Sequence, residues 1–82
     1  MSTLRDQKFH QYSRHLFIIK YAAHKGDVDT VVKHQHLSSK IKSNLIRDYT
    51  RTYFVTWFDI NNEIIEKKAL KAYARDRGYY EC

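Results

Sequence analysis

The feature that most constrains the fold is the near absence of residues that break helices. The chain contains no proline and only two glycines, Gly26 and Gly78, among 82 residues. Folds built from many short strands need these residues at their tight turns, whereas long helices exclude them. Aromatic residues make up 15% of the chain, which is more than disordered basic chains contain, so a hydrophobic core is expected. We therefore predict a single domain over residues 1–82 that is mainly α-helical and contains three or four helices.

The spacing of apolar residues divides the chain at few points. Apolar residues recur every three or four positions over 3–25, which predicts a helix that is apolar almost all round at its middle. We expect this helix at the centre of the domain or at a homodimer interface. Gly26 and Asp27 have the chemistry of a helix end followed by a helix N-cap. The other predicted helices begin at Val28, near Ser39 and, after a turn at 59–62, at Asn62.

The segment 49–58 fits two kinds of secondary structure. It is rich in β-branched and aromatic residues, and its side chains alternate as they do in a strand. Tyr49, Tyr53 and Trp57 are also four residues apart, as on one face of a helix. The sequence leaves both structures open: a helix, or a short β-ribbon around residues 50–58 that gives a winged-helix-like α+β domain.

Residues 31–47 resemble a helix-turn-helix motif. Leu37, Ser38 and Ser39 stand at the position of its turn, although His36 occupies the place that is usually glycine. The resemblance implies that the helix after the turn enters the major groove of DNA.

The polar side of this predicted helix combines side chains that suit nucleic acid. Arginine can bond guanine through two hydrogen bonds, asparagine can do the same to adenine, and lysine and serine suit phosphates. The candidate residues here are Lys40, Ser43, Asn44, Arg47 and Arg51. Further candidates for phosphate contacts are Lys33 and, on one side of the last predicted helix, Lys67, Lys68, Lys71 and Arg75. Glu63 precedes Lys67 by four residues, so part of that charge can also support the helix.

Charge and composition favour a binding protein. The chain has 15 Lys plus Arg against 9 Asp plus Glu, a formal net charge of +6. We expect a small regulator of transcription that binds nucleic acid, DNA rather than RNA, as a homodimer spanning two half-sites. The alternative is a protein-binding inhibitor or adaptor of the phage type that docks on an acidic surface of RNA polymerase or other nucleic-acid machinery. Its interface residues would be Tyr49, Arg51, Tyr53, Trp57 and Phe58.

No motif for catalysis, a cofactor or a metal stands out in the chain. A nucleophile elbow, a phosphate loop and a dinucleotide-binding turn are missing, so we expect neither enzymatic activity nor a cofactor. His34 and His36 are two residues apart and point to different sides of a helix, and His10 and His15 are no better spaced. The sequence therefore predicts no metal site.

The distribution of cysteine and apolar residues bears on location. One cysteine cannot form an intrachain disulfide, which favours a reducing compartment. The longest apolar run, 16–19, is far shorter than a membrane span or the core of a signal peptide. We expect a cytoplasmic protein that does not enter a membrane.

Overall fold

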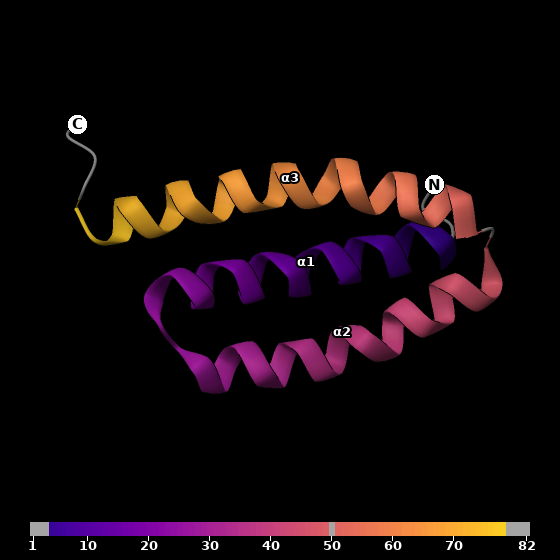
Figure 1. Ribbon diagram of the computed structural model, residues 1–82, viewed down its shortest axis with the longest axis horizontal. Helices are drawn as coiled ribbons and strands as arrows, with labels where there is room; N and C mark the ends of the chain where they lie inside the picture. The colour runs from indigo at the N-terminus through magenta and orange to yellow at the C-terminus, as the bar shows by residue number, and fades with distance from the viewer. Residues whose placement is uncertain (1–3, 50, 79–82) are drawn as a thin grey trace.

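Three long helices make up nearly all of the chain that the structure describes (Figure 1). The computed structural model describes the backbone of residues 4–49 and 51–78 and the side chains of residues 6–49 and 52–78. The helices are α1 (Leu4–Lys25), α2 (Val28–Asp48) and α3 (Arg51–Asp76). The described residues contain no strand, so the prediction of a mainly α-helical domain is confirmed.

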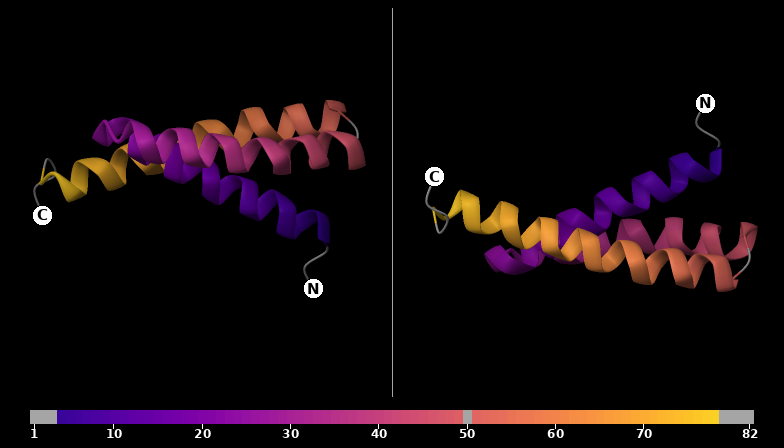
Figure 2. Two further views of the ribbon diagram at one scale, coloured as in Figure 1. Left: turned by 90° about the horizontal axis from the view of Figure 1, so that it is seen from below. Right: turned by 90° about the horizontal axis from the view of Figure 1, so that it is seen from above.

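Helix α1 is the central element of the bundle. Helices α2 and α3 both pack along α1 and touch each other little. Figure 1 shows α1 between the other two, and Figure 2 shows that α1 crosses them at an angle, so that its N-terminal end diverges from both. The predicted central position is confirmed. The middle of α1 packs against α2 and α3 of the same chain, and Phe17, Ile18 and Ile19 stay partly exposed, so the alternative use of this segment as a homodimer contact stays a prediction.

The junction between α1 and α2 forms as its residues predict. Gly26 has φ +81°, the left-handed conformation that ends many helices, and the backbone N–H of Asp27 donates to the carbonyl of Ala22 at 2.9 Å. The Asp27 carboxylate caps α2 by accepting hydrogen bonds from the hydroxyl and the backbone N–H of Thr30. These two bonds lower the pKa of Asp27 below its usual value.

Helix α2 continues through the segment where the sequence predicted the turn of a helix-turn-helix, so this prediction is wrong. The hydroxyls of Ser38 and Ser39 both donate to the carbonyl of Gln35, at 3.1 and 2.9 Å. Serine hydroxyls can cap a new helix, but here they bond back within the existing one. Ser38 is buried against α1 in a groove that Tyr12 and Leu16 also line, and its small side chain lets the two helices approach.

Helix α3 is also uninterrupted, which settles the open structure of residues 51–58 and removes the fourth predicted helix. The β-ribbon and the winged-helix-like alternative are wrong for the described part of this segment, 51–58, which is helical. The turn predicted at 59–62 is wrong too, because the Asn61 side-chain amide donates to the carbonyl of Trp57 at 2.9 Å, within the helix. Within this helix Phe54 is buried against Phe9 and Tyr12 of α1, so the segment is helical in spite of its β-branched and aromatic composition.

The chain does break at a place that the sequence did not indicate, after Tyr49. Tyr49 is extended, with φ −133° and ψ 162°, and its N–H donates the last hydrogen bond of α2 to the carbonyl of Leu45 at 3.0 Å. Its ring lies 6.0 Å from the ring of Phe9 on α1. No glycine or proline stands here, so we attribute the end of α2 to packing between helices.

The core is aromatic and lies at the end of the bundle where α2 joins α3. The Phe9 ring is 4.5 Å from the Trp57 ring and 6.1 Å from that of Phe54, which in turn is 5.8 Å from Tyr12. Burial raises the pKa of the Tyr12 hydroxyl. The buried core cluster consists of Phe9, Tyr12, Leu16, Leu45, Phe54 and Ile65.

The opposite end of the bundle combines buried small residues, Ala22 of α1 and Ala69 and Ala74 of α3, with polar contacts between α1 and α3. The Tyr21 hydroxyl donates to the Asp76 carboxylate, and Lys20 lies 3.6 Å from Glu66. Within the described part of the chain, none of the helices is both long enough and apolar enough to cross a membrane.

Candidate functional site

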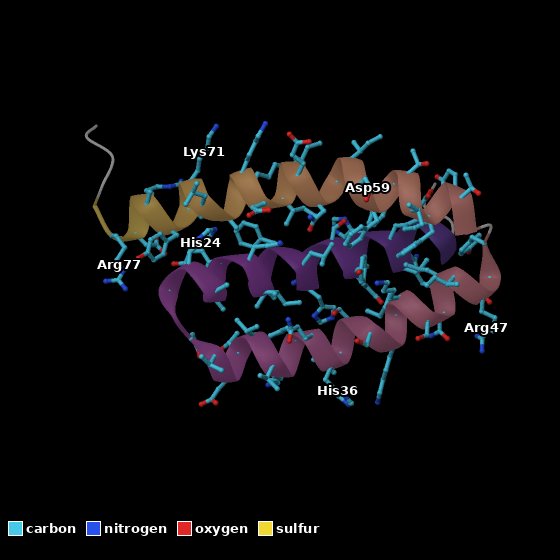
Figure 3. The ribbon with its side chains drawn as sticks, viewed as in Figure 1. His24, His36, Arg47, Asp59, Lys71 and Arg77 are labelled. Carbon is cyan, nitrogen blue, oxygen red and sulfur yellow. The ribbon has the colours of Figure 1, made fainter. Side chains whose placement is uncertain are left out.

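The outer side of α2 carries a line of cations that we call the α2 basic stripe: Lys33, Lys40 and Arg47. All three are exposed, and they recur every seven residues, which is close to two helical turns. The exposed polar residues His36 and Ser43 lie between them on the same side. Figure 3 shows His36 and Arg47 pointing away from α1. The stripe is therefore presented to solvent along about 21 Å of helix.

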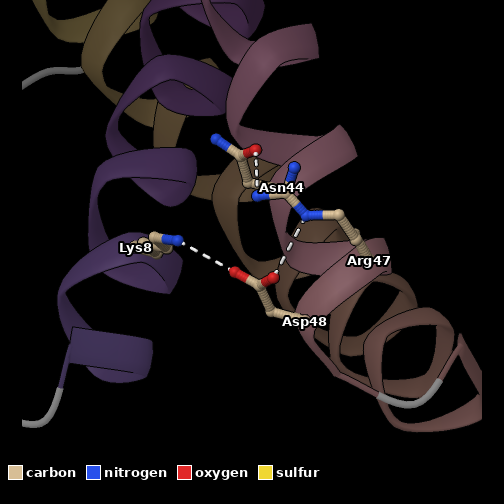
Figure 4. A network of polar contacts seen from close by, with 4 residues as sticks. All are labelled: Lys8, Asn44, Arg47 and Asp48. Atoms are coloured by element: carbon tan, nitrogen blue, oxygen red, sulfur yellow. Dashed lines mark hydrogen bonds and ion pairs between the residues drawn. The ribbon is translucent and has the colours of Figure 1, made fainter.

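The Arg47 side chain of the stripe is held in place by hydrogen bonds to its neighbours on α2 (Figure 4). Its Nε donates to Asp48 at 3.3 Å, and its Nη2 donates to the Asn44 side-chain oxygen at 3.2 Å. Asp48 also accepts a hydrogen bond from Lys8 of α1 at 3.0 Å. These bonds, first from Lys8 and then from Arg47, lower the pKa of Asp48. The Arg47 side chain is nevertheless 74% exposed, so its guanidinium is steadied and still accessible.

The structure brings together only part of the predicted nucleic-acid site. Lys40, Ser43, Asn44 and Arg47 share one side of α2, and Lys33 extends that side toward the start of the helix. The side chain of Arg51 lies outside the described residues. Lys42 is not part of the stripe, because two residues from Lys40 it lies on the opposite side of α2, where its Nζ is 5.6 Å from the centre of the Phe58 ring.

The predicted cations of α3 lie on a different edge of the bundle. Lys67, Lys68, Lys71 and Arg75 are all exposed, and Figure 3 shows Lys71 pointing away from the bundle on the side opposite His36. Lys67 lies 3.4 Å from Glu63, the ion pair that their spacing indicated. The two predicted groups of cations therefore do not form one continuous surface.

The residues predicted for a protein interface are also divided. Tyr49 and Phe58 pack against the aromatic core, and Trp57 is partly buried beside Phe9. Tyr53 is exposed. Three members of the predicted set are therefore partly buried against the core, and Tyr53 is the one whose side chain is described as exposed.

One pair of residues was missed by the sequence analysis: His15 of α1 and His34 of α2. Their Nδ1 atoms are 3.0 Å apart, so one ring nitrogen donates a hydrogen bond to the other. Nineteen residues separate them, and only the packing of α1 on α2 brings them together. Among the described residues, no group of three or more His, Cys, Asp or Glu is placed to hold a metal ion.

We predict that this histidine pair makes the fold sensitive to mild acid. Burial lowers the pKa of His15 from its usual value of 6.5, and the charges of His34 and Arg14 lower it further. The unfolded chain then binds more protons than the folded one, so the stabilising contribution is present above pH 6.5 and is lost as the pH falls below it. Thermal unfolding followed by circular dichroism should show a melting temperature that falls as the pH is lowered from 7 to 5, the range in which histidine takes up a proton.

The matched variants are His15→Gln and His36→Gln. The first should lose this pH dependence, and the second, which changes an exposed histidine, should keep it. The lowered pKa of Asp48 acts in a separate window, because its contribution is lost only as the pH falls below 3.8. Equal pH dependence in wild type and His15→Gln would contradict the assignment.

The fold and the site together define a small basic three-helix bundle with an exposed line of cations on one outer helix. No protein-family model, curated protein sequence or solved structure gives a significant match to the chain. The function is therefore argued from the arrangement of its own residues.

Proposed function

We propose that this protein binds nucleic acid through the α2 basic stripe. The observation that carries the proposal is the alignment of Lys33, Lys40 and Arg47 on the exposed side of one uninterrupted helix. A row of cations on a rigid helix can neutralise several phosphates, and the release of their counterions favours binding. Asp29 and Asp48 stand near the two ends of the stripe, and the helix between them contains no acidic residue.

The proposed mode of binding is contact with the phosphate backbone. The helix-turn-helix arrangement that would aim a helix into the major groove is not formed, because α2 is continuous. Asn44, a candidate for base contacts, already uses its side-chain oxygen to accept a hydrogen bond from Arg47. We infer that phosphate contacts supply most of the affinity and that sequence preference is weak.

The wider role that we propose is a non-enzymatic regulator of transcription in the cytoplasm that acts as a homodimer. One stripe of three cations contacts few phosphates, and two copies would double their number. DNA is the favoured ligand, with RNA as the alternative.

The second candidate is an inhibitor or adaptor that docks on an acidic surface of nucleic-acid machinery. The same stripe favours it, because carboxylate groups on a protein surface attract the same three cations. The two candidates differ in whether purified nucleic acid alone is sufficient for binding.

The test is the affinity of purified protein for a DNA duplex, measured by fluorescence anisotropy at several salt concentrations. The variant Lys33→Glu, Lys40→Glu, Arg47→Glu should lose nearly all binding at low salt. Each phosphate contact contributes about 0.9 to the slope of log affinity against log salt, so three contacts contribute about 2.7. The wild-type slope should reach at least this magnitude.

The control changes the same amount of charge on the other edge of the bundle. The variant Lys68→Glu, Arg75→Glu, Arg77→Glu alters three exposed cations in and directly after α3 that lie outside any residue of the α2 basic stripe, and it should retain most of the affinity. Equal loss in both variants would show that total charge, not the stripe, is responsible. If the wild type does not bind DNA or RNA even at low salt, but retains a stoichiometric protein partner after nuclease treatment, the second candidate replaces the first.

A further inference from the structure

An exposed flank of α3 carries a second regular pattern, which we call the α3 heptad stripe. Its members recur at alternating intervals of four and three residues, the spacing of a helix face that packs against another helix. They are Tyr53, Trp57, Ile60, Ile64, Lys67 and Lys71. This alignment depends on α3 being continuous through residues 59–62, so the sequence analysis, which placed a turn there, did not find it.

The N-terminal part of the stripe is apolar and accessible. Ile60 is 58% exposed, and Tyr53 and Ile64 are 46% and 45% exposed. Trp57 is partly buried against Phe9 and presents its remaining surface in the same row. An isolated exposed apolar residue is ordinary, but four in register over about 16 Å of helix are typical of an interaction surface.

Opposite charges lie at the two ends of this apolar row. Beyond Ile64 the stripe continues as Lys67 and Lys71. At the other end, a groove between α1 and α3 is lined by Tyr53 and Trp57 of α3 and by Asp6 of α1, and its volume is about 270 Å³. The apolar row therefore has the Asp6 carboxylate at one end and, at the other, Lys71 and Lys67, the latter 3.4 Å from Glu63 of the same helix.

We propose that this surface binds a second copy of the chain, with the two α3 helices antiparallel. A two-fold axis between Trp57 and Ile60 places Tyr53 opposite Ile64 of the partner and Trp57 opposite Ile60 of the partner. Lys67 then extends about 4.5 Å along the axis past the partner's Tyr53, toward the partner's Asp6. The same contact is made twice, as in an isologous dimer.

The charges decide the direction of the two helices. A parallel pair in register would set Lys67 against Lys67 of the partner and Lys71 against Lys71 of the partner, which is unfavourable. The antiparallel pair separates these like charges and brings Lys67 of each copy toward the partner's Asp6.

This dimer deepens the proposed function by naming the surface through which two copies associate. It leaves the α2 basic stripe of both copies uncovered, because that stripe lies on the other outer helix. The inference rests on the homodimer of the proposed function but not on nucleic-acid binding. It is tested without nucleic acid, so that a failure to dimerise and a failure to bind nucleic acid are observed separately.

The first test is the molar mass in solution, measured by sedimentation equilibrium over a wide range of protein concentration. The average molar mass of the wild type should rise with concentration from the monomer mass of 9.9 kDa toward twice that value. Ile60→Glu should remain monomeric throughout, with an unchanged helical circular dichroism spectrum. A wild type that stays monomeric at the highest concentration overturns the proposal.

A matched control exists on α2. Val32 is 58% exposed, the same fraction as Ile60, and it lies outside the α3 heptad stripe. Val32→Glu should dimerise as the wild type does. Similar masses for Val32→Glu and Ile60→Glu would overturn the assignment of the interface.

The second test fixes the direction of the helices by disulfide cross-linking in a Cys82→Ser background. Tyr53→Cys and Ile64→Cys proteins are oxidised separately and then as a mixture. The antiparallel dimer predicts cross-linked species mainly in the mixture, because equal positions lie about 16 Å apart along the axis. Cross-linking within each separate sample, without enhancement in the mixture, would indicate a parallel pair and overturn the arrangement.

Discussion

Replacing Phe54 with alanine is expected to remove a large part of the free energy of unfolding. Phe54 is 2% exposed, and its ring packs on those of Phe9 and Tyr12 from α1. Truncation of a buried phenylalanine costs about 3–5 kcal/mol, through lost burial and the cavity that remains. A domain of this length has a free energy of unfolding of about 4–12 kcal/mol, so the loss should be at least about a quarter of it. Urea denaturation followed by circular dichroism measures the loss.

The neighbouring residue supplies the control for this experiment. Val55 is 45% exposed, so Val55→Ala should change the free energy of unfolding by no more than about 1 kcal/mol. If residues 51–58 formed a strand with alternating exposure, other residues of the segment would be in the core. A stable Phe54→Ala variant together with a destabilised Val55→Ala variant would contradict the helical packing of this segment.

Ser39→Pro is expected to have an effect of similar size for a different reason. In the continuous α2, proline at this position removes a backbone hydrogen bond and places its ring against the carbonyl of Gln35, at a cost of about 3 kcal/mol or more. A turn between two helices would tolerate the same substitution far better. Thermal unfolding of Ser39→Pro and of Ser39→Ala separates the backbone effect from the loss of the hydroxyl.

A second proline variant in the same helix tests whether position is the cause. Val28 is the first residue of α2, directly after the cap Asp27, where the backbone N–H has no partner within the helix. Proline is well accepted at this position, so Val28→Pro should keep nearly the wild-type melting temperature. Comparable melting temperatures for Ser39→Pro and Val28→Pro would argue against an unbroken α2.

Local signals predicted the parts of the fold that local chemistry determines. The scarcity of glycine and proline predicted the helical class, and Gly26 with Asp27 predicted the first junction. The errors came from residues with more than one local use. Ser38, Ser39 and Asn61 are common at turns and caps, but each can also bond a carbonyl three or four residues back, as all three do here.

The second junction could not be found from local chemistry. Tyr49 and the residues that follow it include no helix breaker, and the extended backbone of Tyr49 accompanies a ring contact with Phe9, forty residues away. A contact of this kind depends on which helices pack together. The same limit explains why the sequence did not reveal the pairing of His15 with His34.

The candidate sites could likewise be predicted only where the helix boundaries were predicted correctly. The α2 basic stripe was largely visible in the sequence because Lys33, Lys40 and Arg47 fall on one side of any helix that spans them. The α3 heptad stripe was hidden because the predicted turn at 59–62 separated its members. A correct boundary matters more for finding a surface than for estimating helix content.

The central position of α1 makes the two outer helices nearly independent. Because α2 and α3 touch each other little, a substitution on the outer side of one helix does not directly change the contacts of residues on the outer side of the other. Substitutions at Lys40 and at Ile60 should therefore change the free energy of unfolding of the monomer by amounts that add in the double variant. Natural variation could then adjust what one outer helix binds while the other keeps its own contacts.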